Sequence, residues 1–238
     1  MARPQSASIS ARAARRGRAW LAAAFALLCG AAAADDAPAR TLKLRNPAMA
    51  ANTDGRMLVK YLVSCALPAG TVVEVASEGG THRFPGSMGL APAWAERDLN
   101  EAEQRLVSGC ILARTNRYGL PVLLSMRNDD PEAPPALQAD AEERHAHTHF
   151  EGAFFGNLFE PGSPAYACLG GSPGAERTRA LEASLRVCTL PSRGEAPAGL
   201  TRCGFIVVGQ CDAAGYVQDG VDYSAAAVQV FLKAAEPL

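Results

Sequence analysis

The chain has 238 residues, of which 48% are hydrophobic, and its 23 basic and 24 acidic residues give a net charge of −1. A chain of this length forms one sizeable domain or two small ones. Nucleic acids bind basic surfaces through their phosphates, so this charge balance excludes them as expected partners.

Residues 1–34 have the pattern of a cleavable export signal. Several arginines precede a short apolar run at 19–28, and a small-residue stretch and Asp35 follow it. The apolar run is shorter than the roughly 20 residues that span a bilayer. We therefore expect residues 35–238 to be exported to the periplasm or the cell exterior, without a transmembrane segment. Cleavage leaves 18 basic and 24 acidic residues, a net charge of −6, which also argues against anionic lipid.

Two other export routes fit the first 34 residues less well. A lipid anchor through Cys29 requires a small residue before the cysteine, and Leu28 stands there. Arg15 and Arg16 suggest a twin-arginine signal, but Gly17 and Arg18 follow where an apolar pair is expected. Simple cleavage remains the favoured prediction.

The cysteines that remain after cleavage predict a disulfide framework. An even number of cysteines in an exported chain indicates pairing, here as three bridges, and no Cys-x-x-Cys pair points to redox or zinc chemistry. Fifteen pairings are formally open. The six residues are Cys65, Cys110, Cys168, Cys188, Cys203 and Cys211.

Helical spacing is clearest in the first half of the mature chain. Leu58, Leu62 and Cys65, together with Tyr61, share one face of a helix that begins after Asn52 or Thr53 and ends near Leu67. A longer helix is predicted over 95–115, with Cys110 on its apolar stripe. We expect strands at 41–45, 71–76, 120–126, 166–169, 203–208 and 227–233, loops at 79–92 and 191–199, and a helix at 176–187.

Residues 128–144 have a different composition. Residues 128–143 contain six acids and three prolines among few large apolar residues. This composition predicts an exposed, mobile acidic insertion. The whole pattern predicts a single disulfide-stapled α+β domain, in which two or three helices pack on a mainly antiparallel sheet.

The predicted elements suggest how the cysteines pair. Cys65 and Cys110 lie on apolar faces of two helices, so we expect a bridge between these helices. Cys203 and Cys211 are close in sequence and favour a local bridge, which leaves Cys168 to pair with Cys188.

Three histidines alternate along 145–151. If this segment were a strand, His145, His147, His149 and Glu151 would point to one face and could hold a divalent metal such as zinc. The competing interpretation is that these histidines are solvated at the end of the acidic insertion. No P-loop or Gly-x-Gly-x-x-Gly motif predicts a nucleotide cofactor, so a metal is the one cofactor left open.

Residues 151–159 combine two glycines, three phenylalanines and two polar side chains. Glu151 and Asn157 could line a pocket, where apolar neighbours would fit Glu151 for acid or base catalysis. The more ordinary interpretation is a core turn in which both side chains bond the backbone. Two interpretations are also open for Trp94: it packs against the core before the long helix, or it is an exposed platform on which a sugar stacks.

Four segments resemble uncharacterised exported proteins of myxobacteria-like, GC-rich genomes. The segments are 61–67, 89–94, 110–116 and 151–159, and the likeness covers about residues 55–160. The resemblance names no functionally defined family and implies no activity.

Three hypotheses for function follow. The first is an exported binding or envelope-associated module for a small molecule, a glycan or a protein. The second is an extracytoplasmic hydrolase that uses Glu151 and Asn157, with or without a metal on the histidines. The third is a metal-binding protein that uses His145, His147 and His149 alone. Whether the chain is an enzyme, and its oligomeric state, remain open at this point.

Overall fold

A computed structural model describes most of the chain. The described residues are 40–43, 47–77, 80–116, 118, 120–171, 174, 178, 181–182, 186–190, 200–212 and 215–233. The predicted export signal with Cys29 lies outside them, as do most of the predicted helix at 176–187 and the loop at 191–199.

The structure contains three α-helices and ten strands among its described residues. Short 3₁₀ helices precede each α-helix. In chain order the elements are β1 (Arg40–Lys43), η1 (Pro47–Ala50), α1 (Thr53–Ala66), β2 (Thr71–Ser77), β3 (Gly80–Pro85), η2 (Pro92–Ala95), α2 (Glu101–Ala113), β4 (Ser125–Arg127), η3 (Pro135–Leu137), α3 (Ala141–Ala146), β5 (His149–Gly156), β6 (Ala165–Leu169), β7 (Ile206–Gln210), β8 (Val217–Gln218), β9 (Val221–Asp222) and β10 (Val228–Leu232).

The strands form two sheets and one small hairpin. One sheet has the order β1-β2-β3, the other has the order β4-β10-β5-β6-β7, and β8 pairs with β9. The β1–β2 and β6–β7 pairs are parallel, and the other described pairs are antiparallel. The predicted α+β class is confirmed, while a single, mainly antiparallel sheet fits only roughly because the strands divide into separate sheets.

Helix α1 begins at the predicted cap but buries a slightly different face. The side chain of Asn52 accepts a hydrogen bond from the Gly55 amide at 2.7 Å, which satisfies a donor that the first turn leaves open. Leu58 was expected on the buried stripe, yet its side chain is exposed and Val59 is fully buried instead. The stripe therefore runs through Val59, Leu62 and Val63, at the i, i+3, i+4 spacing of one face.

Helix α2 begins six residues later than predicted. Asn100 forms a capping box with Glu103, in which each side chain bonds the backbone amide of the other residue. Such a box fixes where a helix starts. Arg97 pairs with Glu103 through two bonds of 2.7 Å, and Glu101 pairs with Arg105 one turn later.

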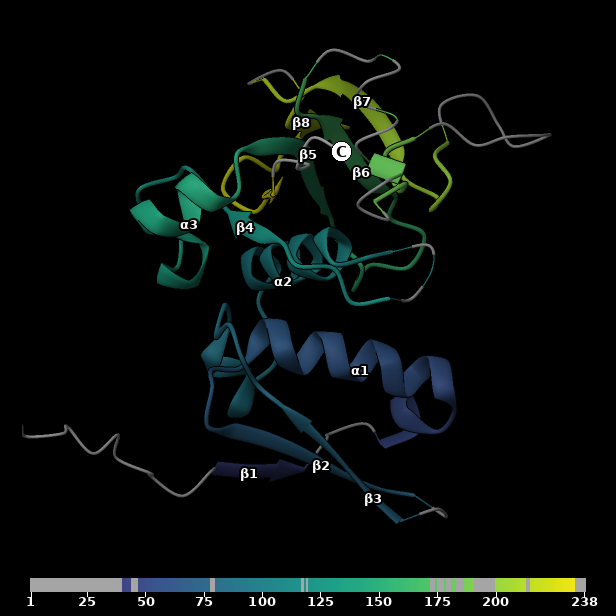
Figure 1. The fold of residues 1–238 in the computed structure, drawn as a ribbon. Helices are drawn as coiled ribbons and strands as arrows, with labels where there is room; N and C mark the ends of the chain where they lie inside the picture. Colours follow the sequence, from purple (N-terminus) through teal and green to yellow (C-terminus); the bar gives the residue numbers. More distant parts are fainter. Residues whose placement is uncertain are drawn as a thin grey trace, which may run out of the picture. The chain divides into compact units, whose positions relative to one another are not determined.

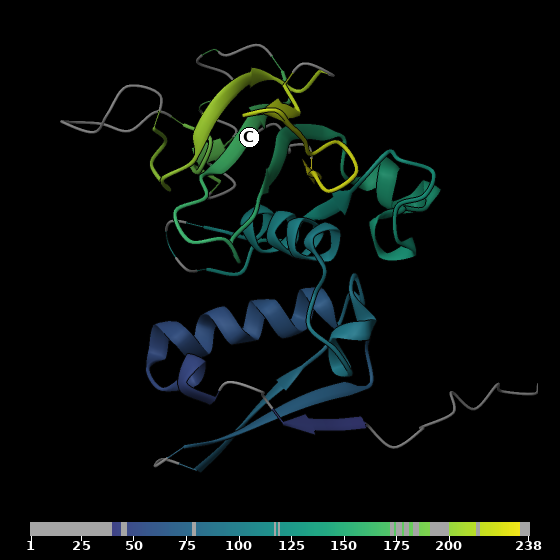
Figure 2. The ribbon, with the colours of Figure 1, turned by 180° about the vertical axis from the view of Figure 1, so that it is seen from behind.

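Helix α2 lies against the five-stranded sheet, and α1 packs on the three-stranded sheet and on α2 (Figure 1). Figure 2 shows the same arrangement from behind. The close approach of α2 requires glycine at position 109, because a Cβ there would lie 2.5 Å from the carbonyl oxygen of Ala226 and 3.2 Å from that of Phe154.

Strand β5 separates two apolar clusters. Phe154 belongs to the larger core, which both long helices share, while Phe155 belongs to a smaller cluster with Tyr166 and Tyr223. Successive side chains of a strand point to opposite faces, so this division follows directly from the sequence of β5.

Two predicted segments have different structures. Residues 79–92 were expected to be a loop, but β3 occupies much of that range and pairs with β2. Residues 120–126 were expected to be a buried strand, but only the last two belong to β4, and Leu120 and Leu123 are exposed. The apolar composition of residues 120–126 does not indicate which of their side chains the sheet buries.

The acidic segment at 128–144 has local structure that its composition did not suggest. It contains η3 and most of α3, and Asp140 caps α3 by accepting from the Glu143 amide at 2.8 Å. Leu137 is fully buried in the larger core. The segment is therefore attached to the domain, although most of its acidic side chains are exposed.

Among the described residues, no helix combines the length and the apolar composition needed to cross a membrane.

Candidate functional site

The six cysteines are paired. Cys65 is joined to Cys110, as predicted, and this bridge links α1 to α2. The other two predicted pairs are wrong: Cys168 is joined to Cys211, and Cys188 is joined to Cys203. The reason is the parallel pairing of β6 with β7, which brings Cys168 beside the residue that follows β7. The three disulfides favour an oxidising, extracytoplasmic compartment.

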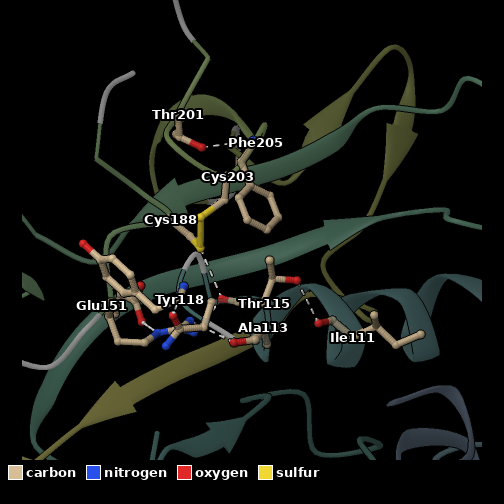
Figure 3. The surroundings of a disulfide bond; sticks show 11 residues. Ile111, Ala113, Thr115, Tyr118, Glu151, Cys188, Thr201, Cys203 and Phe205 are labelled. Carbon is tan, nitrogen blue, oxygen red and sulfur yellow. Dashed lines mark hydrogen bonds and ion pairs between the residues drawn. A yellow bond between two sulfur atoms is a disulfide. The ribbon is translucent and has the colours of Figure 1, made fainter. Parts of the chain in front are cut away.

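Glu151 is a fully buried partner of Arg186. Its Oε2 accepts a hydrogen bond from Nε of Arg186 at 2.8 Å, and the exposed fractions of the two side chains are 0% and 1% (Figure 3). A general acid must reach its substrate, and this carboxylate has no exposed surface. The geometry therefore favours the core interpretation of Glu151 over catalysis.

Arg186 also closes the C-terminal end of α2. Its Nη2 donates to the carbonyl of Ala113 and its Nη1 to the carbonyl of Thr115, both at 2.8 Å (Figure 3). Carbonyls at the end of a helix have no partners within the helix, and the helix dipole attracts a cation there. The guanidinium of Arg186 thus donates hydrogen bonds to the carbonyls at the end of α2 and pairs with the carboxylate of Glu151.

The Cys188–Cys203 bridge lies beside this arginine. The Sγ of Cys188 is 3.2 Å from the carbonyl oxygen of Thr115, which also accepts from Arg186 (Figure 3). Phe205, two residues after Cys203, packs edge-on against Phe154, with ring centroids 5.2 Å apart. The disulfide and the ion pair therefore hold the same corner of the core.

Asn157 supports the turn after β5. Its Oδ1 accepts from the Phe159 amide at 3.1 Å, and its Nδ2 donates to Gln104 on α2. Ser108 accepts from the neighbouring Leu158 amide at 2.9 Å. Through these bonds, polar side chains link α2 to the turn that follows β5.

The alternating histidines do not share one strand. His145 lies in α3, His147 follows that helix, and only His149 belongs to β5. Among the described residues, no group of three His, Cys, Asp or Glu side chains is placed to hold a metal ion. The common face that the alternation required is lost because α3 continues through Ala146.

Trp94 lies in η2 and is partly buried against the larger core. This placement favours packing over a free sugar platform.

A pocket of about 380 Å³ lies where the acidic segment meets β10 and the loop before it. Its volume is within the range of small-ligand sites, which is about 300–1,000 Å³. The lining residues are Asn128, Asp129, Asp130, Pro131, Tyr216, Ser224, Ala227 and Gln229.

Asn128 fixes one wall of this pocket. Its Nδ2 lies within hydrogen-bond distance of the carbonyls of Ser224, Ala225 and Ala227, at 3.0 to 3.3 Å. Its Oδ1 accepts from the Asp130 amide at 2.8 Å. Asn128 is 5% exposed and joins two loops that are far apart in sequence.

Tyr216 and Gln229 form the opposite polar contact. Burial raises the pKa of Tyr216, a hydrogen bond from Gln229 acts against this shift, and the charges of Asp129 and Asp212 add to it. The Oε1 of Gln229 is buried and has no hydrogen-bond partner among the described residues. The two bonded side chains therefore form a polar part of the pocket wall.

None of the residues that line this pocket was predicted as a site. The sequence signal was the run Asn128-Asp129-Asp130-Pro131, whose composition is that of a turn. Turn residues also form binding loops, so the composition alone could not distinguish the two.

Tyr166 lies beyond Phe155 in the smaller cluster. Its hydroxyl donates to Oδ2 of Asp219 at 2.7 Å, and it shares the cluster with Tyr223, over which Arg105 lies at 5.5 Å. Burial of the ring, followed by the bond to Asp219, raises the pKa of Tyr166 to about 12.

No protein-family model matches this chain, and no curated protein or solved structure is significantly similar to it.

We predict that Glu151→Gln and Arg186→Met each lower the free energy of unfolding by about 3–5 kcal/mol, because each leaves a buried charge unpaired. The double variant should lose less than the sum of the two, by about 0.5–3 kcal/mol. Denaturant unfolding of the oxidised protein measures all three. Glu74→Gln is the control, because it removes the exposed pair with Arg83 and should cost less than about 1 kcal/mol. Additive losses would contradict the ion pair.

We predict that Tyr166 ionises late in a titration of tyrosinate absorbance, near its raised pKa of about 12. The folded state then holds a proton that the unfolded state has already lost, so this contribution to stability is present below pH 10 and is lost as the pH rises towards about 12. Burial also raises the pKa values of Tyr216 and Tyr223, so Tyr166→Phe should remove one tyrosine's absorbance from the step near pH 12 and not the whole late rise. Tyr118→Phe, at an exposed ring, should leave that step unchanged. An unchanged amplitude near pH 12 in Tyr166→Phe would refute the assignment.

Proposed function

We propose that this chain is an exported, disulfide-stapled binding protein that takes a small polar ligand into the pocket between residues 128–131 and 216–229. The observation that carries the proposal is the pocket itself. Its volume suits a small molecule, and its wall is held by Asn128 before any ligand arrives. A wall that is already ordered reduces the entropy lost on binding.

The lining is polar where a ligand would need partners. Asp129, Asp130 and Ser224 belong to the lining and carry side-chain oxygen atoms. These oxygens are hydrogen-bond acceptors for the N–H or O–H groups of a polar ligand.

The export part of the proposal places the mature protein, residues 35–238, in the periplasm or outside the cell. The three disulfides and the export-signal pattern of residues 1–34 support it.

We predict that the intact mass of the protein recovered from its exported fraction corresponds to a chain that starts at Asp35. The mass should also lack about six hydrogens, as three disulfides require. Reduction of the disulfides should add the missing hydrogens back to the measured mass. A chain that keeps residues 1–34, or that has free thiols before reduction, would contradict the export proposal.

We predict that mature protein binds at least one member of a defined set of small molecules and that Ser224→Trp abolishes this binding. The set consists of N-acetylglucosamine, maltose, N-acetyl-lysine methylamide and N-acetyl-norleucine methylamide, tested by calorimetry. Ser224 is an exposed residue of the lining, so a large ring there fills the pocket from its rim.

Thr81→Trp is the matched control, because it places the same ring at an exposed position on β3, far from the pocket in sequence. It should bind as the wild type does. Equal thermal midpoints of the two variants show that Ser224→Trp is folded. If no member of the set binds, or if Ser224→Trp binds normally, the proposed function is wrong.

A further inference from the structure

The lining of the pocket contains two carboxylates. They belong to Asp129 and Asp130, and an ionised carboxylate accepts hydrogen bonds but donates none. The amide nitrogen of Asn128, a potential donor, is already taken by backbone carbonyls. A ligand that fits these partners must therefore bring its own N–H or O–H groups.

The two aspartates give the lining a negative charge, and the buried Arg127 is one described cation whose charge reaches Asp129. No Lys or Arg belongs to the lining. The nearest described cation to Asp129 is Arg144, whose Nη1 lies 4.0 Å from Oδ1 of Asp129, and both side chains are exposed. Such an exposed contact neutralises little of the carboxylate's charge. Asp212 adds its charge near Tyr216.

Tyr216 provides an aromatic wall beside these carboxylates. Its ring packs on Phe155, with centroids 5.7 Å apart, so the ring is held by the smaller cluster. An aromatic ring next to carboxylates favours an organic cation, which gains from both the charge and the π face. A bare metal ion is not favoured, because the described residues place no third ligand of the His, Cys, Asp or Glu type with the two aspartates.

We infer that the pocket selects an organic cation, a primary ammonium or a guanidinium, held by Asp129 and Asp130 against Tyr216. This inference rests on the proposed binding function and names its ligand class. A lysine-like or arginine-like side chain and a free alkyl amine share this chemistry.

The test compares N-acetyl-lysine methylamide with N-acetyl-norleucine methylamide, which differ at the end of the side chain by the ammonium group. Calorimetry on residues 35–238 should show binding of the lysine compound and at least about tenfold weaker binding of the norleucine compound. Binding of the lysine compound should weaken with added salt, because salt screens the attraction between exposed charges.

The variant Asp129→Asn/Asp130→Asn should weaken binding of the lysine compound by about tenfold or more, since each change removes a charge and keeps the shape. Glu132→Gln is the matched control: it removes an exposed carboxylate of the same segment that does not line the pocket. It should leave the affinity within about twofold. N-acetyl-arginine methylamide should bind as the lysine compound does, and its binding should weaken in the same variant.

Three results would overturn the inference. Equal binding of the lysine and norleucine compounds, or full affinity in Asp129→Asn/Asp130→Asn, would show that charge does not select the ligand. Binding of N-acetylglucosamine or maltose that Ser224→Trp abolishes, without binding of the lysine compound, would overturn the cation and leave the proposed binding function intact. Failure of all four compounds would contradict the proposed function itself.

Discussion

The guanidinium of Arg186 joins three parts of the chain that are far apart in sequence. It pairs with Glu151 on β5 and donates to the carbonyls of Ala113 and Thr115 at the end of α2. A buried cation with a carboxylate and carbonyl partners is tolerated because every partner is placed for it, and removal of one partner leaves an expensive charge behind. The packing of α2 on the sheet, and with it the position of β5 and β10, depends on this arrangement.

The disulfides reinforce the same construction. Cys188–Cys203 joins the residues that follow Arg186 to the residues that precede β7. Cys65–Cys110 attaches α1 to α2. Cys168–Cys211 joins β6 to the end of β7 on the other side of the sheet. A crosslink restricts the unfolded chain, so these bonds stabilise long-range contacts that local propensity cannot secure. None of these cysteines lines the pocket, but Tyr216 of the pocket wall packs in the smaller cluster with Cys168 and Cys211.

Features that a periodic pattern marks were readable from the sequence, and other long-range contacts were not. The cap at Asn52 follows from local helix chemistry. The Cys65–Cys110 bridge spans 45 residues, but it was predictable because each cysteine lies on the apolar face of its own helix. The role of Glu151 depends on Arg186, 35 residues later, and no periodicity links the two. The pocket was missed for a related reason: Tyr216 and Gln229 meet the acidic segment only because β10 pairs with β4.

The central claim is that Glu151 is an internal counterion and not an acid that reaches a substrate. Nuclear magnetic resonance of arginine Nε–H groups tests this claim most directly. In a fully buried pair with a bond of 2.8 Å, the Arg186 Nε–H should exchange slowly with solvent and lie close in space to the Glu151 side chain. The Nε–H of Arg83, whose side chain is 62% exposed, provides the fast-exchanging reference. An Arg186 Nε–H that exchanges as fast as that of Arg83 would show that Glu151 and Arg186 are open to water, and would contradict the account.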